Sequence, residues 1–296
     1  MHHRHVAACL AMGIMMGSAL PGSAAPRRIV ALGDLHGDLG AARAALRLAG
    51  AIDGSDRWVG GDLVVVQTGD QLDRGDQEQA VLELLERLQD EALAAGGQVH
   101  VLNGNHELMN ARLDFRYVTG GGFADFEDAV VVVEADSLLL AHDPGQRARV
   151  KAFRPGGPYA RLLAERPVVL ILEDNVFVHG GLLPLHLDYG IERLNREVRD
   201  WLLGHGEAPA FIHSRTSPTW ARDYSDEADA ADCLQLQDVL GRLGAARMIV
   251  GHTVQEQGIA PQCDGRVWCI DSGLSGHYGG RIEVLEIVGD RVRVLR

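Results

Sequence analysis

Five short polar motifs follow one another along the chain, and each combines glycine with residues that bind metals or carry protons. The motifs are Gly33-Asp34-Leu35-His36-Gly37, Gly69-Asp70-Gln71-Leu72-Asp73-Arg74-Gly75, Gly104-Asn105-His106-Glu107, His179-Gly180-Gly181 and Gly251-His252. They supply carboxylate and amide oxygens together with imidazole nitrogens, a donor set suited to Mn, Fe or Zn rather than to metals that prefer thiolates. With one carboxylate shared, six such side chains can hold two ions.

A single motif of this kind would be weak evidence for a functional site. An isolated Gly-Asp or Gly-His pair usually forms a plain turn, and an isolated histidine such as His179 usually belongs to the core. A strand that turns sharply with polar residues at its tip does, however, need the backbone freedom of glycine. Five such motifs at successive strand ends therefore favour a functional site over five unrelated turns.

The segments before the motifs are short apolar runs without period-two alternation, as expected for strands buried on both faces. This pattern, interleaved with helical stretches, predicts an α/β fold whose ligands bind at the carboxyl ends of the strands. The final part of the chain is expected to form antiparallel hairpins. Strands are predicted at 28–32, 63–66, 98–102, 168–172, 176–178, 248–250, 266–270, 281–288 and 291–295, and helices at 39–49 and 76–95.

Residues 26–296 are expected to form one domain, because α/β folds often reach this size as a single unit. Within it, residues 108–166 are less regular and predict a helical insertion that covers the site. Two glycine-rich stretches, Gly120-Gly121-Gly122 and Pro155-Gly156-Gly157-Pro158, are predicted to be flexible or turning points of this insertion.

Residues 1–25 have the pattern of a secretory signal peptide: a basic start, an apolar run and then small residues. The apolar run is too short to span a membrane. Cleavage near Ala25 predicts a mature chain in the periplasm or outside the cell, without a membrane span.

The mature chain would keep three cysteines, Cys233, Cys263 and Cys269. An odd number does not define a disulfide framework. Cys263 and Cys269 flank a turn and offer one possible bridge, but their offset around the turn favours the alternative, in which the cysteines are unpaired small hydrophobic residues.

The balance of charge limits the partners. The chain has 28 Lys and Arg residues against 41 Asp and Glu residues, a formal net charge of −13, so it should repel nucleic acid and anionic membrane surfaces. A bound anion therefore needs a local positive site. The single lysine, Lys151, argues against Schiff-base or P-loop chemistry, whereas arginine suits phosphate recognition.

The ordered series of motifs closely resembles the PPP-type phosphoprotein phosphatases within the calcineurin-like metallophosphoesterases, whose marks are G-D-x-H-G, G-D-x-x-D-R-G, G-N-H-E, H-G-G and G-H. The resemblance runs from residue 28 to about 288. The stretches Met109-Asn110, Asp114-Phe115-Arg116-Tyr117-Val118 and Gly156-Gly157-Pro158-Tyr159-Ala160-Arg161 look like the Shewanella-like branch. The resemblance implies a β-sandwich flanked by helices, with a dinuclear metal site at the carboxyl ends of the strands.

The resemblance also implies a role for each candidate ligand. Two divalent cations, Mn or a mixed Fe/Zn pair, would lower the pKa of a bridging water, so that a hydroxide attacks phosphorus directly without a covalent phosphoenzyme. Asp34 and His36 would hold the first ion, Asp70 would bridge, and the second ion would be held by Asn105, His179 and His252.

Further residues receive roles in catalysis and substrate binding from the same resemblance. His106 would protonate the leaving oxygen, Asp73 would orient His106, and the planar fork of Arg74 would bind phosphate. Trp220-Ala221-Arg222 resembles the W-x-R of the family, so Arg222 is the preferred second phosphate-binding arginine and Arg215 the alternative. Tyr278 lies near the place where family members bring an aromatic residue over the metals.

The function implied is that of a metal-dependent phosphomonoester hydrolase that acts on phosphorylated protein, peptide or small phosphomonoesters. Preference for phosphoserine and phosphothreonine or for phosphotyrosine stays open, as does the oligomeric state. One alternative is a dinucleoside polyphosphate hydrolase, which shares the motifs but attacks an anhydride. The other is a non-catalytic metal-binding protein, against which the joint presence of His106, Asp73 and Arg74 argues.

Overall fold

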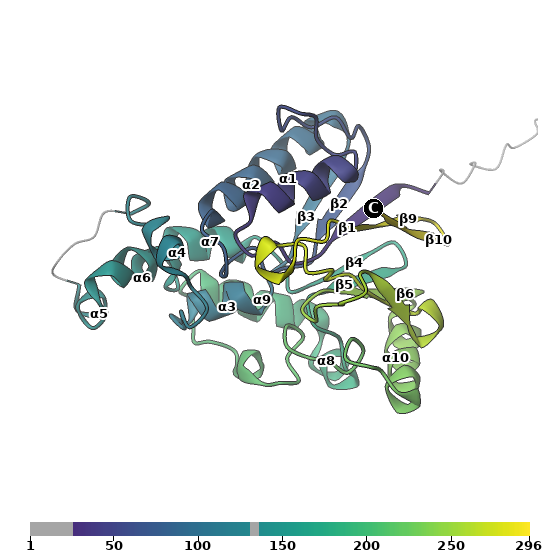
Figure 1. Ribbon diagram of the computed structural model, residues 1–296. Helices are drawn as coiled ribbons and strands as arrows, with labels where there is room; N and C mark the ends of the chain where they lie inside the picture. The colour runs from purple at the N-terminus through teal and green to yellow at the C-terminus, as the bar shows by residue number, and fades with distance from the viewer. Residues whose placement is uncertain (1–25, 131–135) are drawn as a thin grey trace, which may run out of the picture.

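The computed structural model describes residues 26–130 and 136–296 and contains two five-stranded sheets that face each other (Figure 1). The strand order is β10-β9-β1-β2-β3 in the first sheet and β4-β5-β6-β8-β7 in the second. The first sheet comprises β1 (Arg28–Leu32), β2 (Val64–Gln67), β3 (Gln98–Val101), β9 (Val284–Val288) and β10 (Arg291–Leu295). The second comprises β4 (Val169–Leu172), β5 (Asn175–Val178), β6 (Arg247–Val250), β7 (Ala260–Gln262) and β8 (Val267–Cys269).

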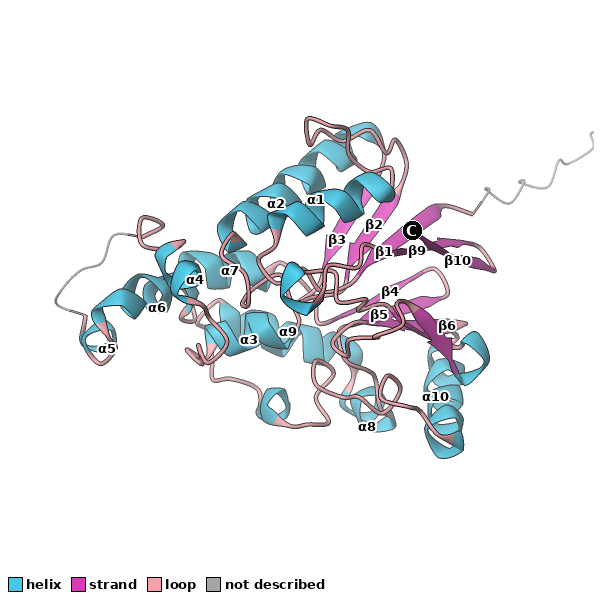
Figure 2. Ribbon diagram, viewed as in Figure 1, coloured by secondary structure: helices cyan, strands magenta, loops and turns pink. Residues whose placement is uncertain are grey.

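Helices cover the outer face of each sheet, which confirms the predicted sandwich flanked by helices (Figure 2). Helices α1 (Leu39–Leu48) and α2 (Glu78–Ala95) cover the first sheet. Against the second sheet pack α9 (Ile191–Leu202) and α10 (Ala230–Leu243), with the short α8 (Pro184–Tyr189) beside them.

Strand β1 shows why its sequence does not alternate between apolar and polar residues. Ile29 and Ala31 belong to the core between the two sheets, where Phe177 and Ile249 of the second sheet also lie. Val30 and Leu32 belong to the separate core under α1 and α2. Because both faces of the strand are buried from Ile29 to Leu32, these four positions are all apolar.

The parallel strands of both sheets end at one edge of the sandwich. Strands β1, β2 and β3 are parallel neighbours, and so are β5, β6 and β8. At Gly33, just after β1, an added Cβ would lie only 2.5 Å from the carbonyl oxygen of Ile270, which follows β8. The two sheets approach so closely at this edge that glycine is required, and the polar motifs meet there.

The segment expected as a helical insertion contains most of the remaining helices and lies beyond this edge of the sandwich (Figure 1). After α3 (Asn105–Ala111) come α4 (Gly120–Ala124), α5 (Ser137–Leu140), a 3-10 turn at Pro144–Gln146, α6 (Arg147–Phe153) and α7 (Pro158–Ala164).

The glycine run at the start of α4 was expected to be a flexible or turning point, and that prediction is wrong. Thr119 caps the helix by accepting a hydrogen bond from the Gly122 backbone N–H at 2.8 Å. A Cβ at Gly121 would lie 2.3 Å from the carboxyl carbon of Asp76, and one at Gly122 would lie 2.7 Å from Glu78 Oε1. Glycine at 121 and 122 therefore lets α4 lie against Asp76 and Glu78 at the start of α2, whereas a side chain at Gly120 would meet nothing within 4 Å.

The final part of the chain differs from the expected antiparallel hairpins in one respect. Strands β9 and β10 do form such a hairpin, but β8 pairs in parallel with β6 on one side and antiparallel with β7 on the other. Strand β7 has three residues and contains Pro261, so its sequence gave no strand signal.

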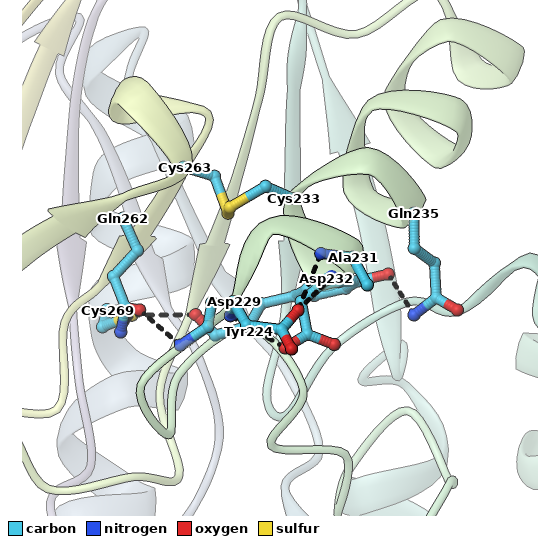
Figure 3. The surroundings of a disulfide bond; sticks show 10 residues. Tyr224, Asp229, Ala231, Asp232, Cys233, Gln235, Gln262, Cys263 and Cys269 are labelled. Atoms are coloured by element: carbon cyan, nitrogen blue, oxygen red, sulfur yellow. Dashed lines mark hydrogen bonds between the residues drawn. A yellow bond between two sulfur atoms is a disulfide. The ribbon is translucent and has the colours of Figure 1, made fainter.

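A disulfide joins Cys233 to Cys263, which corrects the expectation of unpaired cysteines (Figure 3). Cys233 lies in the first turn of α10 and Cys263 in the turn after β7, with their Cα atoms 5.2 Å apart. Cys269 is free and buried on β8, so the Cys263–Cys269 bridge also considered does not form. The partners are 30 residues apart in sequence, and only the packing of α10 against the second sheet brings them together.

The predicted signal peptide, residues 1–25, lies outside the described residues. Among the residues that are described, no helix combines the length and apolar character needed to cross a membrane.

Candidate metal centre

The six candidate ligands come from the loops after five strands and meet at the common edge of the two sheets. Two triplets of side chains have potential ligand atoms within 4.8 Å of one another. His36, Asp70 and His106 form the first triplet, and Asp70 is shared with the second, which adds His179 and His252. The shared carboxylate is the one expected to bridge two ions.

The remaining two candidates touch these triplets. Asp34 places Oδ2 3.9 Å from His36 Nε2 and accepts hydrogen bonds from the His252 backbone N–H at 3.2 Å. Asn105 places Oδ1 2.9 Å from His179 Nε2, which itself lies 3.2 Å from Asp70 Oδ2. The structure therefore brings all six predicted metal ligands into one cluster.

Glu107 holds the loops that carry the ligands, although the sequence analysis assigned it no role. Its carboxylate is fully buried and accepts hydrogen bonds from four backbone N–H groups. The donors and N···O distances are Asp70 at 2.8 Å, Gln71 at 2.9 Å, Leu72 at 3.2 Å and Gly104 at 2.7 Å. A buried carboxylate satisfied in this way fixes the loops after β2 and β3 relative to each other.

Five non-glycine residues of the site have backbone φ angles in the left-handed region, which is rarely populated by such residues. The φ values are 45° for His36, 57° for Asp70, 66° for Asp73, 70° for Arg74 and 67° for His252. Strained backbone of this kind clusters at functional sites and persists only where the surroundings hold it. Here the Asp70 carbonyl accepts hydrogen bonds from the backbone N–H groups of Leu35 and His36 at 2.9 and 3.0 Å.

The titration behaviour of the cluster reflects crowded, buried charges. Burial and the neighbouring carboxylates of Asp271 and Asp70 raise the pKa of Asp34 well above its usual value. Burial lowers the pKa of His36 to about 4, and burial together with His179 lowers the pKa of His252. The imidazoles of His36 and His252 are therefore neutral and able to coordinate a metal near pH 7, while the crowded carboxylates around Asp34 repel one another.

Divalent cations fit this arrangement. Nε2 of His252 is buried and has no hydrogen-bond partner, although buried polar atoms are almost always satisfied. A cation between the carboxylates and the imidazoles would be bound by the lone pair of His252 Nε2. It would also offset the repulsion between the carboxylates of Asp34, Asp70 and Asp271. Oxygen and imidazole donors of this kind match Mn, Fe or Zn.

His106 and Asp73 form a buried pair beside the cluster. His106 Nδ1 lies 2.6 Å from Asp73 Oδ2, and the second carboxylate oxygen accepts a hydrogen bond from Asn110 Nδ2 at 2.8 Å. Burial alone would lower the pKa of His106, but Asp70 and Asp73 outweigh it and raise the pKa to about 9. The paired nitrogen orients the ring, which leaves Nε2, 3.7 Å from Asp70 Oδ2, on the side of the metal cluster.

A cavity of about 90 Å³ is lined by residues of the cluster together with aromatic and arginine side chains, which we call the upper wall. The guanidinium carbon of Arg74 lies 4.0 Å from the centroid of the Tyr117 ring, and its Nε is buried without a partner. The Tyr278 ring centroid lies 5.3 Å from that of His36. The residues of this upper wall are Arg74, Tyr117, Trp220, Arg222, Val254 and Tyr278.

The two candidate arginines of the substrate site are separated by the structure. Arg222 lines the cavity and donates a hydrogen bond to Thr253 Oγ1 at 2.9 Å. Arg215 is exposed and is not among the described residues that line the cavity. Pro218 lies between the two arginines in sequence, and its carbonyl accepts hydrogen bonds from the backbone N–H groups of Gly180 and Gly181. These bonds hold the part of the loop that carries Arg222, rather than the part that carries Arg215, next to the site.

Several residues that line the cavity were not proposed as site residues from the sequence, among them Asp271 and Tyr117. Asp271 follows β8 and is nearly fully buried, and burial raises its pKa to about 6. Like the other carboxylates of the site it lies just after a buried strand, but Ile270 rather than a glycine precedes it. Tyr117 belongs to the insertion and carried no chemical signal of its own.

Comparisons with known proteins agree with this geometry. The calcineurin-like phosphoesterase profile matches residues 27–256, which is more than half of the chain. The chain belongs to the calcineurin-like phosphoesterase family. It is 43% identical to Shewanella-like protein phosphatase 2 of Arabidopsis thaliana, over 90% of this chain and 76% of that protein.

Solved structures of protein phosphatases extend the comparison. The cold-active protein-tyrosine phosphatase of a psychrophilic Shewanella species is 25% identical, with a TM-score of 0.69 over 92% of this chain and 81% of that one. A protein serine/threonine phosphatase of Saccharomyces cerevisiae, at 16% identity and a TM-score of 0.60, shares the fold. The chain is a phosphatase of this family, as the order of its motifs indicated.

Proposed function

We propose that this calcineurin-like phosphoesterase is a protein phosphatase that accepts phosphotyrosine. The observation that supports this choice is the ring of aromatic side chains, Tyr117, Trp220 and Tyr278, around a small cavity above the metal ligands. An aryl phosphate places its ring among these side chains while its phosphate reaches the ligands below, and offset or edge-on aromatic contacts favour such a ring.

Arg74 and Arg222 bind the phosphate in this proposal. Nε of Arg74 is buried and unpartnered, and stacking on Tyr117 fixes the plane of the guanidinium. Arg222 approaches from the opposite loop, held by Thr253. Two guanidinium groups offer several N–H donors to the phosphate oxygens and stabilise charge as the leaving group departs.

His106 supplies the proton that the departing oxygen needs. The charged form of His106 is favoured by Asp73, which holds Nδ1 and keeps Nε2 directed at the cavity. As the bond between phosphorus and the leaving oxygen breaks, the electron pair goes to that oxygen and the His106 proton neutralises it. The products are then a free hydroxyl group and inorganic phosphate.

Two divalent cations, manganese or a mixed iron and zinc pair, complete the site in this proposal. Asp34, His36 and Asp70 would hold the first ion, and Asn105, His179 and His252 would join Asp70 around the second. Such ions would supply Lewis-acid chemistry, which makes a water molecule acidic enough to react at neutral pH and neutralises charge on the phosphate.

Phosphopeptides that differ only in the phosphorylated residue test the proposed preference for phosphotyrosine. The chain, stripped with chelator and supplied with Mn2+, is assayed on peptides of one sequence that carry phosphotyrosine or phosphoserine, and on p-nitrophenyl phosphate and diadenosine tetraphosphate. We expect the phosphotyrosine peptide to have the higher kcat/KM, and His106→Asn to abolish turnover. Preference for the serine peptide contradicts the aromatic cavity argument, and preference for the tetraphosphate favours an anhydride hydrolase.

We also propose that the protein acts in the periplasm or outside the cell. The signal-peptide pattern of residues 1–25 is the first support, and the Cys233–Cys263 disulfide is the second, since such bonds persist mainly in oxidising compartments. N-terminal sequencing of the protein recovered from the periplasm or medium should start near Pro26. A protein that keeps Met1 would contradict export by cleavage.

A further inference from the structure

Arg149 is a fully buried arginine far in sequence from the five motifs. It lies on α6 of the insertion, and its guanidinium makes four hydrogen bonds. The acceptors and N···O distances are Asn110 Oδ1 at 2.8 Å, the Gly122 carbonyl at 2.8 Å, Asp73 Oδ1 at 3.2 Å and Glu78 Oε2 at 2.6 Å. A buried ion pair is an inefficient source of stability, so the contact with Asp73 needs another explanation.

The contacts of Asp73 show what Arg149 fixes. One carboxylate oxygen faces His106, and the other accepts from both Asn110 and Arg149. Arg149 also donates to the side-chain carbonyl of Asn110, which keeps the amide N–H of Asn110 directed at Asp73. Arg149 therefore holds Asp73 directly and through Asn110, and so prevents rotation of the carboxylate away from His106.

Aromatic packing holds the guanidinium itself in place. Its carbon lies 4.9 Å from the ring centroid of Phe126 and 5.0 Å from that of Phe153, which are both fully buried residues of the insertion. The planar cation stacks on such rings favourably. Together with its hydrogen bonds to Asn110 of α3 and Glu78 of α2, this stacking means that Arg149 reaches Asp73 only while α6 lies beside these helices.

We propose that Arg149 is a positioning residue for the His106–Asp73 pair, so that proton donation to the leaving oxygen depends on the docked insertion. The proposal rests on the phosphomonoesterase function proposed above. If the His106–Asp73 pair is no longer held in position, kcat should fall most for substrates whose leaving oxygen needs a proton. Nitrophenolate is a stabilised anion and departs with little protonation, whereas phenolate depends on it more strongly.

The test compares p-nitrophenyl phosphate with phenyl phosphate in Arg149→Met and in Arg147→Met, a matched change on the same helix. Arg147 donates to the carbonyl of His142 within the insertion and touches no residue of the pair in the structure. For Arg149→Met we expect kcat on phenyl phosphate to fall about tenfold further than kcat on p-nitrophenyl phosphate. KM and the number of bound metal ions should stay unchanged, and Arg147→Met should behave as the wild type.

A second background keeps the test decisive if Arg149→Met alone does not fold. Removing Arg149 leaves the buried Glu78 side chain without its hydrogen-bond donor, so the change is also made in Glu78→Gln and compared with Glu78→Gln alone. The same difference between the two substrates is expected there. Equal losses on both substrates, or no loss, would overturn the proposal. A wild-type chain that hydrolyses neither substrate with any metal would instead contradict the hydrolytic function on which the proposal rests.

Discussion

His106 Nδ1 lies 2.6 Å from Asp73 Oδ2, and the side chain of Asp73 is completely buried. Asp73→Asn keeps the size of the side chain but removes the charge that stabilises the protonated ring. We expect kcat on p-nitrophenyl phosphate to fall roughly 10²–10⁴-fold with two metal ions still bound. The exposed Asp90, changed to Asn in parallel, should leave kcat unaltered. Full turnover of Asp73→Asn across the pH range would show that the pairing has no role in catalysis.

A substitution at Gly104 tests whether the carboxylate of Asp70 bridges the two metal ions. Its φ of −93° suits any residue, but a Cβ there would lie 2.1 Å from Asp70 Oδ1 and 2.6 Å from the Asp70 backbone nitrogen. Gly104→Ala must therefore displace Asp70, and we expect Mn2+ titration by calorimetry to show fewer than two bound ions. The control is Gly120→Ala, where the added methyl group meets nothing within 4 Å. Two ions bound to Gly104→Ala with wild-type affinity would refute Asp70 as the bridge.

The Cys233–Cys263 disulfide should contribute measurably to stability. It closes a loop with a sequence separation of 30 residues, for which chain entropy predicts about 3–4 kcal/mol. Cys233→Ser combined with Cys263→Ser should lower Tm by several degrees in calorimetry. A reductant should lower the wild-type Tm to the same extent and leave the double variant unaffected. A reductant effect on the double variant would point to another cause.

Glu78 should make stability depend on pH. Burial outweighs the attraction of Arg149 and raises the pKa of Glu78 to about 8, above its unfolded value near 4.5. A raised carboxyl pKa contributes stability that is fully present below the unfolded value and is lost as pH rises towards 8. Glu78→Gln cannot ionise, so its Tm relative to wild type should rise between pH 5 and pH 9. A Tm difference that is constant over this range would mean that Glu78 does not titrate in the folded protein.

The residues predicted correctly from the sequence are those whose signal is local. Asp34, Asp70 and Asn105 each follow a buried strand and a glycine, so the strand end and the donor are visible within a few residues. The sheet then brings them together without further information, because parallel strands end at a common edge. Asp271 also follows a buried strand, β8, but Ile270 rather than a glycine precedes it, so it lacks half of this local signal.

The residues missed or misplaced depend on packing between distant segments. Arg149 reaches Asp73 across 76 positions, and nothing in its helix distinguishes it from the neighbouring Arg147. Arg215 and Arg222 were both candidates for the second phosphate-binding arginine. Only the backbone contacts at Pro218 determine that Arg222 lines the cavity. Cys233 and Cys263 likewise meet only because α10 packs near the turn after β7.

The two candidate metal positions differ in which sheets of the sandwich supply their ligands. Asp34, His36 and Asp70 all follow strands of the first sheet, whereas the second position adds His179 and His252 from the second sheet. An ion at the second position would therefore join the two sheets as a crosslink does. Because linkage is reciprocal, its binding would stabilise the packing of the two sheets, and separation of the sheets would weaken its binding.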